Sequence, residues 1–193
     1  MRRLLISLTA CLALLGLAAC SDTEGTNEAG YIAGDGQVET IRAVDRGEPV
    51  ELSGETLEGE PLDVADLRGK PVVVNVWWSG CGPCRTEMPM LQAVHEQLGD
   101  QVAFVGVNTR DNSTVTAQAF ERHFEVEYPS LYSPDGKAVL ALAREVHPAT
   151  IPATIVLDPQ GRAAAVIRGP IPTETTLESI IEDAAGESLT GRA

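Results

Sequence analysis

A strand that leads directly into a pair of cysteines is the feature that most constrains this chain. Residues 71–77 form a nearly continuous β-branched run, Pro-Val-Val-Val-Asn-Val-Trp, which is typical of a central strand covered on both faces. Cys81 and Cys84 follow shortly after it, and from Cys84 to about Leu98 apolar residues recur at helical spacing until Gly99. The sequence therefore predicts a C-x-x-C motif between a buried strand and the start of a helix.

A cysteine at the start of a helix has a specific chemical use. The unpaired N–H groups and the dipole of the first turn favour the thiolate form of Cys81. Cys84 would lie one turn later, shielded from solvent but close enough to form a disulfide. Pro83 suits the first turn, because its missing N–H would be unpaired there anyway, and Gly82 leaves the attacking sulfur unobstructed. The pattern indicates a nucleophile, Cys81, and a resolving thiol, Cys84, that share two electrons.

Other uses of the cysteine pair fit the sequence less well. A zinc site needs two further ligands, and the histidines that remain, His95, His123 and His147, lack paired spacing. Haem attachment requires a histidine after the second cysteine, where Arg85 stands. A purely structural disulfide is the remaining alternative, but it would close so short a loop that it adds little chain-entropy stabilisation.

The rest of the chain alternates between expected strands and helices. A short hairpin is expected over residues 50–62, turning at Glu58-Gly59, and is followed by one helical turn over 63–67. Further strands are expected at 102–107, 154–157 and 163–167, and helices at 113–124, 137–146 and 173–185. The alternation predicts an α/β fold with a central mixed β-sheet flanked by helices and an N-terminal β-hairpin extension.

The N-terminal segment has the pattern of a secretion signal. A basic start, Met1-Arg2-Arg3, precedes an apolar run, Leu4 to Ala19, that is short for a membrane span of about 20 residues but suits a signal peptide. The run ends in Leu17-Ala18-Ala19-Cys20, which resembles the lipobox of bacterial lipoproteins. The resemblance implies that residues 1–19 are removed and that Cys20 receives a lipid. An ordinary signal peptide with an incidental cysteine, or an uncleaved anchor, is the alternative.

A polar segment separates this signal from the predicted domain. Residues 20–48 are rich in Gly, Asp, Glu, Thr and Asn without a clear period, so we expect a flexible tether after Cys20 and a single folded domain over residues 49–193. Docking of Tyr31, Ile32, Val38 and Ile41 onto the domain is the alternative. The whole chain carries 28 acidic against 14 basic residues, a net charge of −14, which argues against nucleic acid as a partner.

The segment from Asn75 to Pro89, Asn-Val-Trp-Trp-Ser-Gly-Cys-Gly-Pro-Cys-Arg-Thr-Glu-Met-Pro, resembles the active site of the thioredoxin superfamily, in particular its extracytoplasmic TlpA/ResA/DsbE group. The likeness extends over roughly residues 49–185 and includes Ile151-Pro-Ala-Thr. It implies a thioredoxin-like fold in which Cys81 attacks, Cys84 resolves and Pro152 is the cis-proline that faces the disulfide. Ile151 would then pair its main chain with a substrate strand. An ordinary trans proline at a strand edge is the alternative.

Three positions near the cysteines bear on the mechanism. Asn75 stands where cytoplasmic thioredoxins carry a buried Asp, and it cannot take a proton. Glu87 matches the active-site glutamate of the ResA-like group, so we expect it to take the proton of Cys84, with a pKa raised by desolvation. A solvated first-turn glutamate is the alternative. Gly80 departs from the family, which usually has Trp there. We expect Trp77 to be core and Trp78 to replace the missing ring beside the disulfide.

These features together predict a lipid-anchored, extracytoplasmic thiol–disulfide oxidoreductase that needs no cofactor. By resemblance, it would reduce protein disulfides, such as those of apocytochrome c during cytochrome c maturation, and take electrons from a membrane thiol carrier such as a CcdA/DsbD-like protein. We expect a monomer. Disulfide formation in secreted proteins is the alternative direction. A peroxiredoxin fits less well, because its Thr-x-x-Cys motif is not matched, and a non-enzymatic binding lipoprotein would not need the C-x-x-C pair.

Overall fold

The computed structural model describes residues 37–186 and 189 of the 193-residue chain. The predicted signal peptide, Cys20 and the first part of the predicted tether lie outside the described residues. Among the described residues, no helix has both the length and the apolar character needed to cross a membrane.

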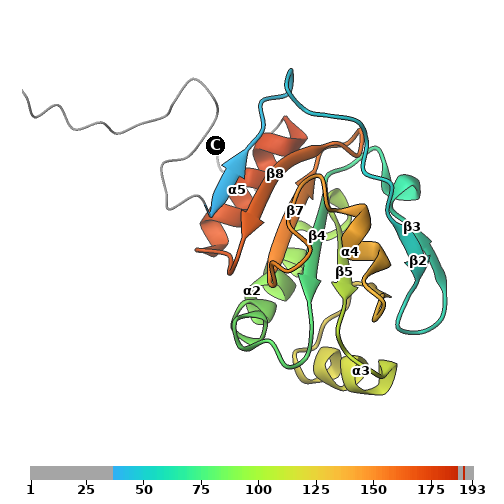
Figure 1. Ribbon diagram of the computed structural model, residues 1–193. Helices are drawn as coiled ribbons and strands as arrows, with labels where there is room; N and C mark the ends of the chain where they lie inside the picture. Colours follow the sequence, from blue (N-terminus) through green and yellow to red (C-terminus); the bar gives the residue numbers. More distant parts are fainter. Residues whose placement is uncertain (1–36, 187–188, 190–193) are drawn as a thin grey trace, which may run out of the picture.

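A six-stranded mixed sheet forms the centre of the domain (Figure 1). Its strand order is β1 (Val38–Thr40), β8 (Ala163–Arg168), β7 (Ala153–Leu157), β4 (Val72–Trp77), β5 (Ala103–Asn108) and β6 (Ser130–Tyr132). The strands β4, β5 and β6 run parallel to one another, whereas β7 is antiparallel to both β4 and β8. Every residue of β4 and β5 is buried, as the β-branched run predicts for a central strand.

Helices cover both faces of the sheet (Figure 1). The helices α2 (Gly82–Leu98), α3 (Thr114–His123) and α5 (Glu174–Ala185) pack on one face. The other face is covered by α4 (Lys137–Ala141), the hairpin of β2 (Ser53–Glu55) and β3 (Pro61–Asp63), and the short 3₁₀ helix Val64–Leu67. A further 3₁₀ turn, Gly99–Gln101, follows α2. The predicted fold class, a mixed sheet flanked by helices with an N-terminal hairpin, is confirmed.

Local capping signals explain where the helices begin and end. Ser113 and Thr173 cap α3 and α5 by accepting backbone N–H groups with their hydroxyls. Gly186 ends α5 in the left-handed region, at φ 76°, where a side chain would be strained. Helix α4 is shorter than predicted, because Leu142 and Ala143 bond to carbonyls three residues earlier and the chain continues in turns.

The sheet begins earlier in the chain than the sequence predicts. Strand β1 pairs with β8, with Val38 opposite Ile167 and Thr40 opposite Ala165. Val38 and Ile41 both pack against the core. The prediction of a flexible tether is therefore wrong for residues 37–41, and the docking alternative is correct for Val38 and Ile41. Tyr31 and Ile32 lie outside the described residues.

Candidate active site

The two cysteines form a disulfide where β4 gives way to α2. The Cys81 and Cys84 sulfurs are 2.00 Å apart. Cys81 is the N-cap of α2, and its Sγ accepts a hydrogen bond of 3.2 Å from the backbone N–H of Cys84. Cys81 retains 6% exposure, whereas Cys84 has none. A reagent from solvent therefore meets Cys81 first, at a helix end that favours a thiolate.

Glu87 lies one helical turn after Cys84 and is buried, with 2% exposure. Its Oε1 accepts a hydrogen bond of 3.0 Å from Asn75 Nδ2, and its Oε2 accepts one of 3.1 Å from the backbone N–H of Ile171. Burial raises the pKa of Glu87 to about 7, although these two hydrogen bonds oppose the rise. The alternative of a solvated first-turn glutamate is therefore wrong, and a proton acceptor poised near neutral pH lies close to the resolving cysteine.

The peptide bond between Ile151 and Pro152 is cis, as the family resemblance implies. Ala153 pairs with Val76 across the sheet, so Pro152 lies at the same end of the sheet as the segment that leads from β4 to Cys81. Ile151 is half-buried and packs against the core cluster that contains both cysteines. The alternative of a trans proline is wrong.

The loop after β8 joins these parts of the site. The backbone N–H of Gly169 donates to the carbonyl oxygen of Pro152 at 2.9 Å, and the N–H of Ile171 donates to Glu87. The carbonyl oxygen of Pro170, between them, accepts a hydrogen bond from the Gln37 side chain. This loop could not be predicted from the sequence, because it acts through backbone groups that every residue type provides.

A second residue that sequence reasoning missed is Asp111, in the loop between β5 and α3. Its side chain is buried and accepts hydrogen bonds from the Ser79 backbone N–H at 2.9 Å, the Ser79 hydroxyl at 2.5 Å and Asn108 Nδ2 at 2.8 Å. The only sequence signal is that Asp111 follows a buried strand, so that it falls at the same edge of the sheet as the cysteines.

The two tryptophans before the motif differ in position. Trp77 is fully buried, stacks on Phe120 with ring centroids 4.8 Å apart, and donates from Nε1 to Ser130 Oγ at 3.2 Å. Trp78 is half-buried and packs against the core cluster that contains the cysteines. The prediction that Trp77 is a core residue is confirmed.

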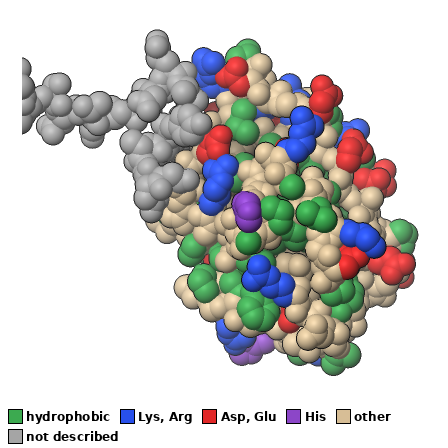
Figure 2. Space-filling view, viewed as in Figure 1, with side chains coloured by type: hydrophobic (Ala, Val, Ile, Leu, Met, Phe, Trp, Pro, Cys, Tyr) green, Lys and Arg blue, Asp and Glu red, His purple; other side chains and the backbone are tan. Residues whose placement is uncertain are grey.

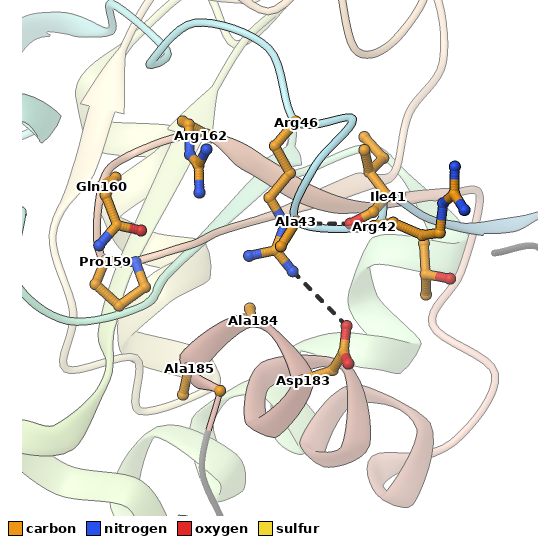
Figure 3. A pocket seen from close by; sticks show the side chains of 12 residues that line it. Ile41, Arg42, Ala43, Arg46, Pro159, Gln160, Arg162, Asp183, Ala184 and Ala185 are labelled. Atoms are coloured by element: carbon orange, nitrogen blue, oxygen red, sulfur yellow. Dashed lines mark hydrogen bonds and ion pairs between the residues drawn. The ribbon is translucent and has the colours of Figure 1, made fainter. Parts of the chain in front are cut away.

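One hollow in the described part of the chain lies away from the disulfide. It has a volume of about 590 Å³ and is lined by residues before β2, the β7–β8 turn and the end of α5 (Figure 3). Arg46 reaches across it toward Asp183, and both Arg46 and Arg162 contact the buried carboxylate of Asp158. These charges compensate one another, and the hollow lies beyond the end of β7 opposite to Pro152. It is therefore not part of the disulfide site.

Surface charge also differs between the two ends of the sheet. On the face seen in Figure 2, acidic side chains lie mainly along the upper and right-hand edges, which include the hairpin β2–β3. Few lie at the lower end, where β4 leads toward Cys81. The strong net negative charge is therefore not concentrated around the disulfide on this face.

Comparison with known proteins identifies a family and several relatives. A family model described as Redoxin matches residues 42–183. The thiol-disulfide oxidoreductase ResA of Bacillus subtilis is 29% identical over 130 residues, which cover 67% of each chain. The chain spans about two thirds of the length of the curated relatives that it matches.

Solved structures match over almost their whole length. A DsbF homologue from Corynebacterium diphtheriae is 37% identical with a TM-score of 0.72, and the match covers 79% of this chain and 96% of the other. A secreted thiol-disulfide isomerase from Corynebacterium glutamicum is 30% identical with a TM-score of 0.73, and the match covers 81% and 97%. The disulfide, Glu87 and Pro152 all lie within residues 42–183, the range that the Redoxin family model matches.

Proposed function

The chain belongs to the Redoxin family, in its ResA- and DsbE-like group of thioredoxin-fold thiol–disulfide oxidoreductases, and we propose that it reduces disulfides of proteins outside the cytoplasm. The observation that carries the proposal is the Cys81–Cys84 disulfide at the start of α2, at the same end of the sheet as cis-Pro152 and within one turn of a buried carboxyl. Neither a structural disulfide nor a simple binding domain needs these three features together.

The reaction transfers two electrons from the reduced Cys81–Cys84 pair to the substrate disulfide. The Cys81 thiolate attacks one substrate sulfur, which forms a mixed disulfide and releases the other substrate sulfur as a thiolate that takes a proton from water. Cys84 then attacks Cys81 Sγ, which releases the second substrate thiolate and leaves Cys81 and Cys84 oxidised. A thiol reductant must reduce the pair before the next cycle.

Glu87 assists the second step. The Cys84 thiol must lose its proton to attack, and it has no solvent exposure. Glu87, with its pKa raised by burial to about 7, is ionised often enough near neutral pH to accept that proton and basic enough to hold it. Asn75, which contacts Glu87, contributes a hydrogen bond and cannot itself take a proton.

The substrate lies against the cis-proline side of the disulfide. Ile151 precedes the cis bond and is half-buried, so its main chain is placed to pair with an extended substrate segment. Recognition through main-chain hydrogen bonds tolerates many substrate sequences. Trp78, which is half-buried beside the same cluster, provides an apolar contact.

The cellular setting follows from the N-terminal sequence. The lipobox-like Leu17-Ala18-Ala19-Cys20 supports a lipid anchor on Cys20 at the outer side of the cell membrane, and several similar proteins are named as secreted. In that setting the protein would keep the haem-attachment cysteines of apocytochrome c reduced and draw electrons from a membrane thiol carrier of the CcdA/DsbD type. Replacing Cys20 with Ser should move the protein from the membrane to the soluble fraction. Unchanged partitioning would refute the anchor.

The reduction potential of the Cys81–Cys84 couple tests the direction of the reaction. It can be measured on protein that begins at Ser21, by equilibration with thiol redox buffers. A value at or below about −220 mV, the range of glutaredoxins and thioredoxin, supports the reductase. A value near −120 mV, as for the oxidant DsbA, would instead make disulfide formation the function. Absence of a reversible couple would refute both.

A further inference from the structure

In the segment between β4 and the disulfide, Trp78-Ser79-Gly80, the Trp78 ring occupies the space beside position 80. A Cβ atom on Gly80 would lie 2.3 Å from Cζ3 and 2.6 Å from Cη2 of Trp78, well inside any real Cβ contact. Gly80 is not among the glycines with positive φ, so its backbone does not require glycine. A side chain at position 80 would therefore require the Trp78 ring to move, because the ring fills the space beside that position.

The Trp78 ring lies over Gly80, the residue that precedes Cys81. It packs against the cluster that contains Cys81 and Cys84, and the carbonyl oxygen of Trp78 accepts a hydrogen bond of 3.1 Å from the backbone N–H of Cys81. Part of the ring remains exposed, whereas the neighbouring Trp77 fills the core. A partly exposed apolar side chain therefore lies over the residue that precedes Cys81.

Asp111 fixes this segment from a distant part of the chain. Both of its carboxylate oxygens accept hydrogen bonds from Ser79, one from the backbone N–H and one from the hydroxyl, and Asn108 supplies a further donor. Hydrogen bonds to a buried carboxylate are stronger than bonds between neutral groups. The residue before it, Arg110, has a φ of 64°, which is uncommon for a side chain other than glycine. Tyr132 donates to the Asp111 carbonyl oxygen at 3.1 Å and holds the same loop.

We propose that Trp78 is a specificity-determining residue, the apolar wall of the substrate site, and that Asp111 is the residue that positions it. The inference rests on the reductase function proposed above and names its substrate class. Preferred substrates are polypeptide disulfides with an apolar side chain beside the target cysteine, because only these bury surface against the ring. Small hydrophilic disulfides gain nothing from it.

The role of Trp78 as an apolar wall can be tested with two cyclic disulfide peptides. One has Leu and the other Gly beside the first cysteine, and they are otherwise identical. We expect the parent protein to reduce the Leu peptide with a kcat/KM about tenfold higher than the Gly peptide, which corresponds to about 1.4 kcal/mol. Trp78→Ala should abolish this preference, because the kcat/KM for the Leu peptide falls about tenfold, toward that for the Gly peptide. An unchanged preference in Trp78→Ala would overturn the proposal.

Two further variants separate a contact role from a folding effect. In Trp78→Ala/Gly80→Trp, the space beside position 80 is free, so a ring at position 80 should restore the preference for the Leu peptide. Trp77→Phe changes a tryptophan of the core and should keep the preference. Failure of the double variant to restore it, in protein that unfolds at the parent's midpoint, would contradict the role of the ring.

The positioning role of Asp111 has its own readout. The chain has two tryptophans, so Trp77→Phe leaves Trp78 as the sole emitter. In that background, Asp111→Asn should shift the emission to longer wavelength, increase quenching by acrylamide about twofold and weaken the Leu preference, while the reduction potential stays as in the parent. Ser79→Ala, which removes only the hydroxyl bond, should act in the same direction but less.

Unaltered emission and preference in Asp111→Asn would overturn the positioning role. The test also distinguishes this inference from the proposed function. If the parent reduces neither peptide, the reductase function and the substrate class both fail, and the emission of Trp78 in Asp111→Asn still decides whether Asp111 positions the ring.

Discussion

Replacing Glu87 with Gln should change how the stability of the domain depends on pH. The pKa of Glu87 rises from 4.5 to about 7 because the carboxyl is buried, with hydrogen bonds from Asn75 and Ile171 opposing the rise. Since the folded-state pKa is raised, the folded protein holds this proton more tightly than the unfolded chain. Stability is therefore lost as pH rises from 4.5 through 7, and the ionised carboxylate is tolerated above that range at a cost.

The size of the effect follows from the two pKa values. A tenfold change in proton affinity is worth about 1.4 kcal/mol, so the full penalty for burying the ionised form is about 3 kcal/mol above pH 8. About 1.4 kcal/mol of it is already present at pH 5.5, a practical lower limit for a protein with a pI near 4.5. The Gln side chain is neutral throughout. The free energy of unfolding of the parent, minus that of Glu87→Gln, should therefore fall by about 2 kcal/mol between pH 5.5 and pH 8.

Urea unfolding of the oxidised proteins at these two pH values measures the difference. Titration of the other carboxyls is common to both proteins and cancels in the subtraction. Glu174→Gln, at an exposed position in the first turn of α5, is the matched control for the loss of one carboxylate. If the difference for Glu87→Gln changed by less than about 0.5 kcal/mol, the assignment of a raised pKa to the buried carboxyl would be refuted.

Three other changes test separate parts of the structure. Cys84→Ser should accumulate a mixed disulfide between Cys81 and its substrate, visible by mass spectrometry without reductant; rapid release would show that another thiol resolves it. Gly106→Ala places a Cβ atom 1.9 Å from Ser130 Oγ, so it should lower the free energy of unfolding by about 1–3 kcal/mol, and unchanged urea midpoints would contradict this packing. A chain that lacks residues 1–41 loses β1 and its bond to the loop after β8. The Glu87-dependent loss of unfolding free energy with rising pH should then occur at lower pH, because the carboxyl becomes hydrated. An unchanged pH dependence would show that β1 does not shield the site.

Most of the fold follows from signals that are local in the sequence. The β-branched run of β4 and the helical spacing that ends at Gly99 both predict their elements nearly to the residue. Strands β1 and β6 were not predicted, because each has only three residues. Their partner strands, β8 and β5, are also not adjacent to them in the sequence. So short a strand carries no period of its own, and β1 also lies next to a polar segment.

The residues of the site likewise divide into those that the sequence predicts and those that it does not. The cysteine pair, the buried Glu87 and cis-Pro152 belong to sequence motifs and were predicted by resemblance to the family. Asp111 and Ile171 were not, because their contributions depend on which residues the sheet brings together. Asp111 meets Ser79 only after β4 and β5 align, and Ile171 contributes a backbone N–H that has no signature in the sequence.

The position of β1 also determines where the N-terminal segment enters the domain relative to the disulfide. The carbonyl oxygen of Gln37 accepts a hydrogen bond from Arg168, so the chain enters the domain beside the loop that contacts Pro152 and Glu87. With Cys20 as the anchor proposed above, the covalent path to Gln37 cannot exceed about 60 Å. The end of the sheet that carries the disulfide is therefore the end at which the segment from Cys20 enters the domain. Such confinement gives membrane-embedded thiols an effective concentration in the millimolar range.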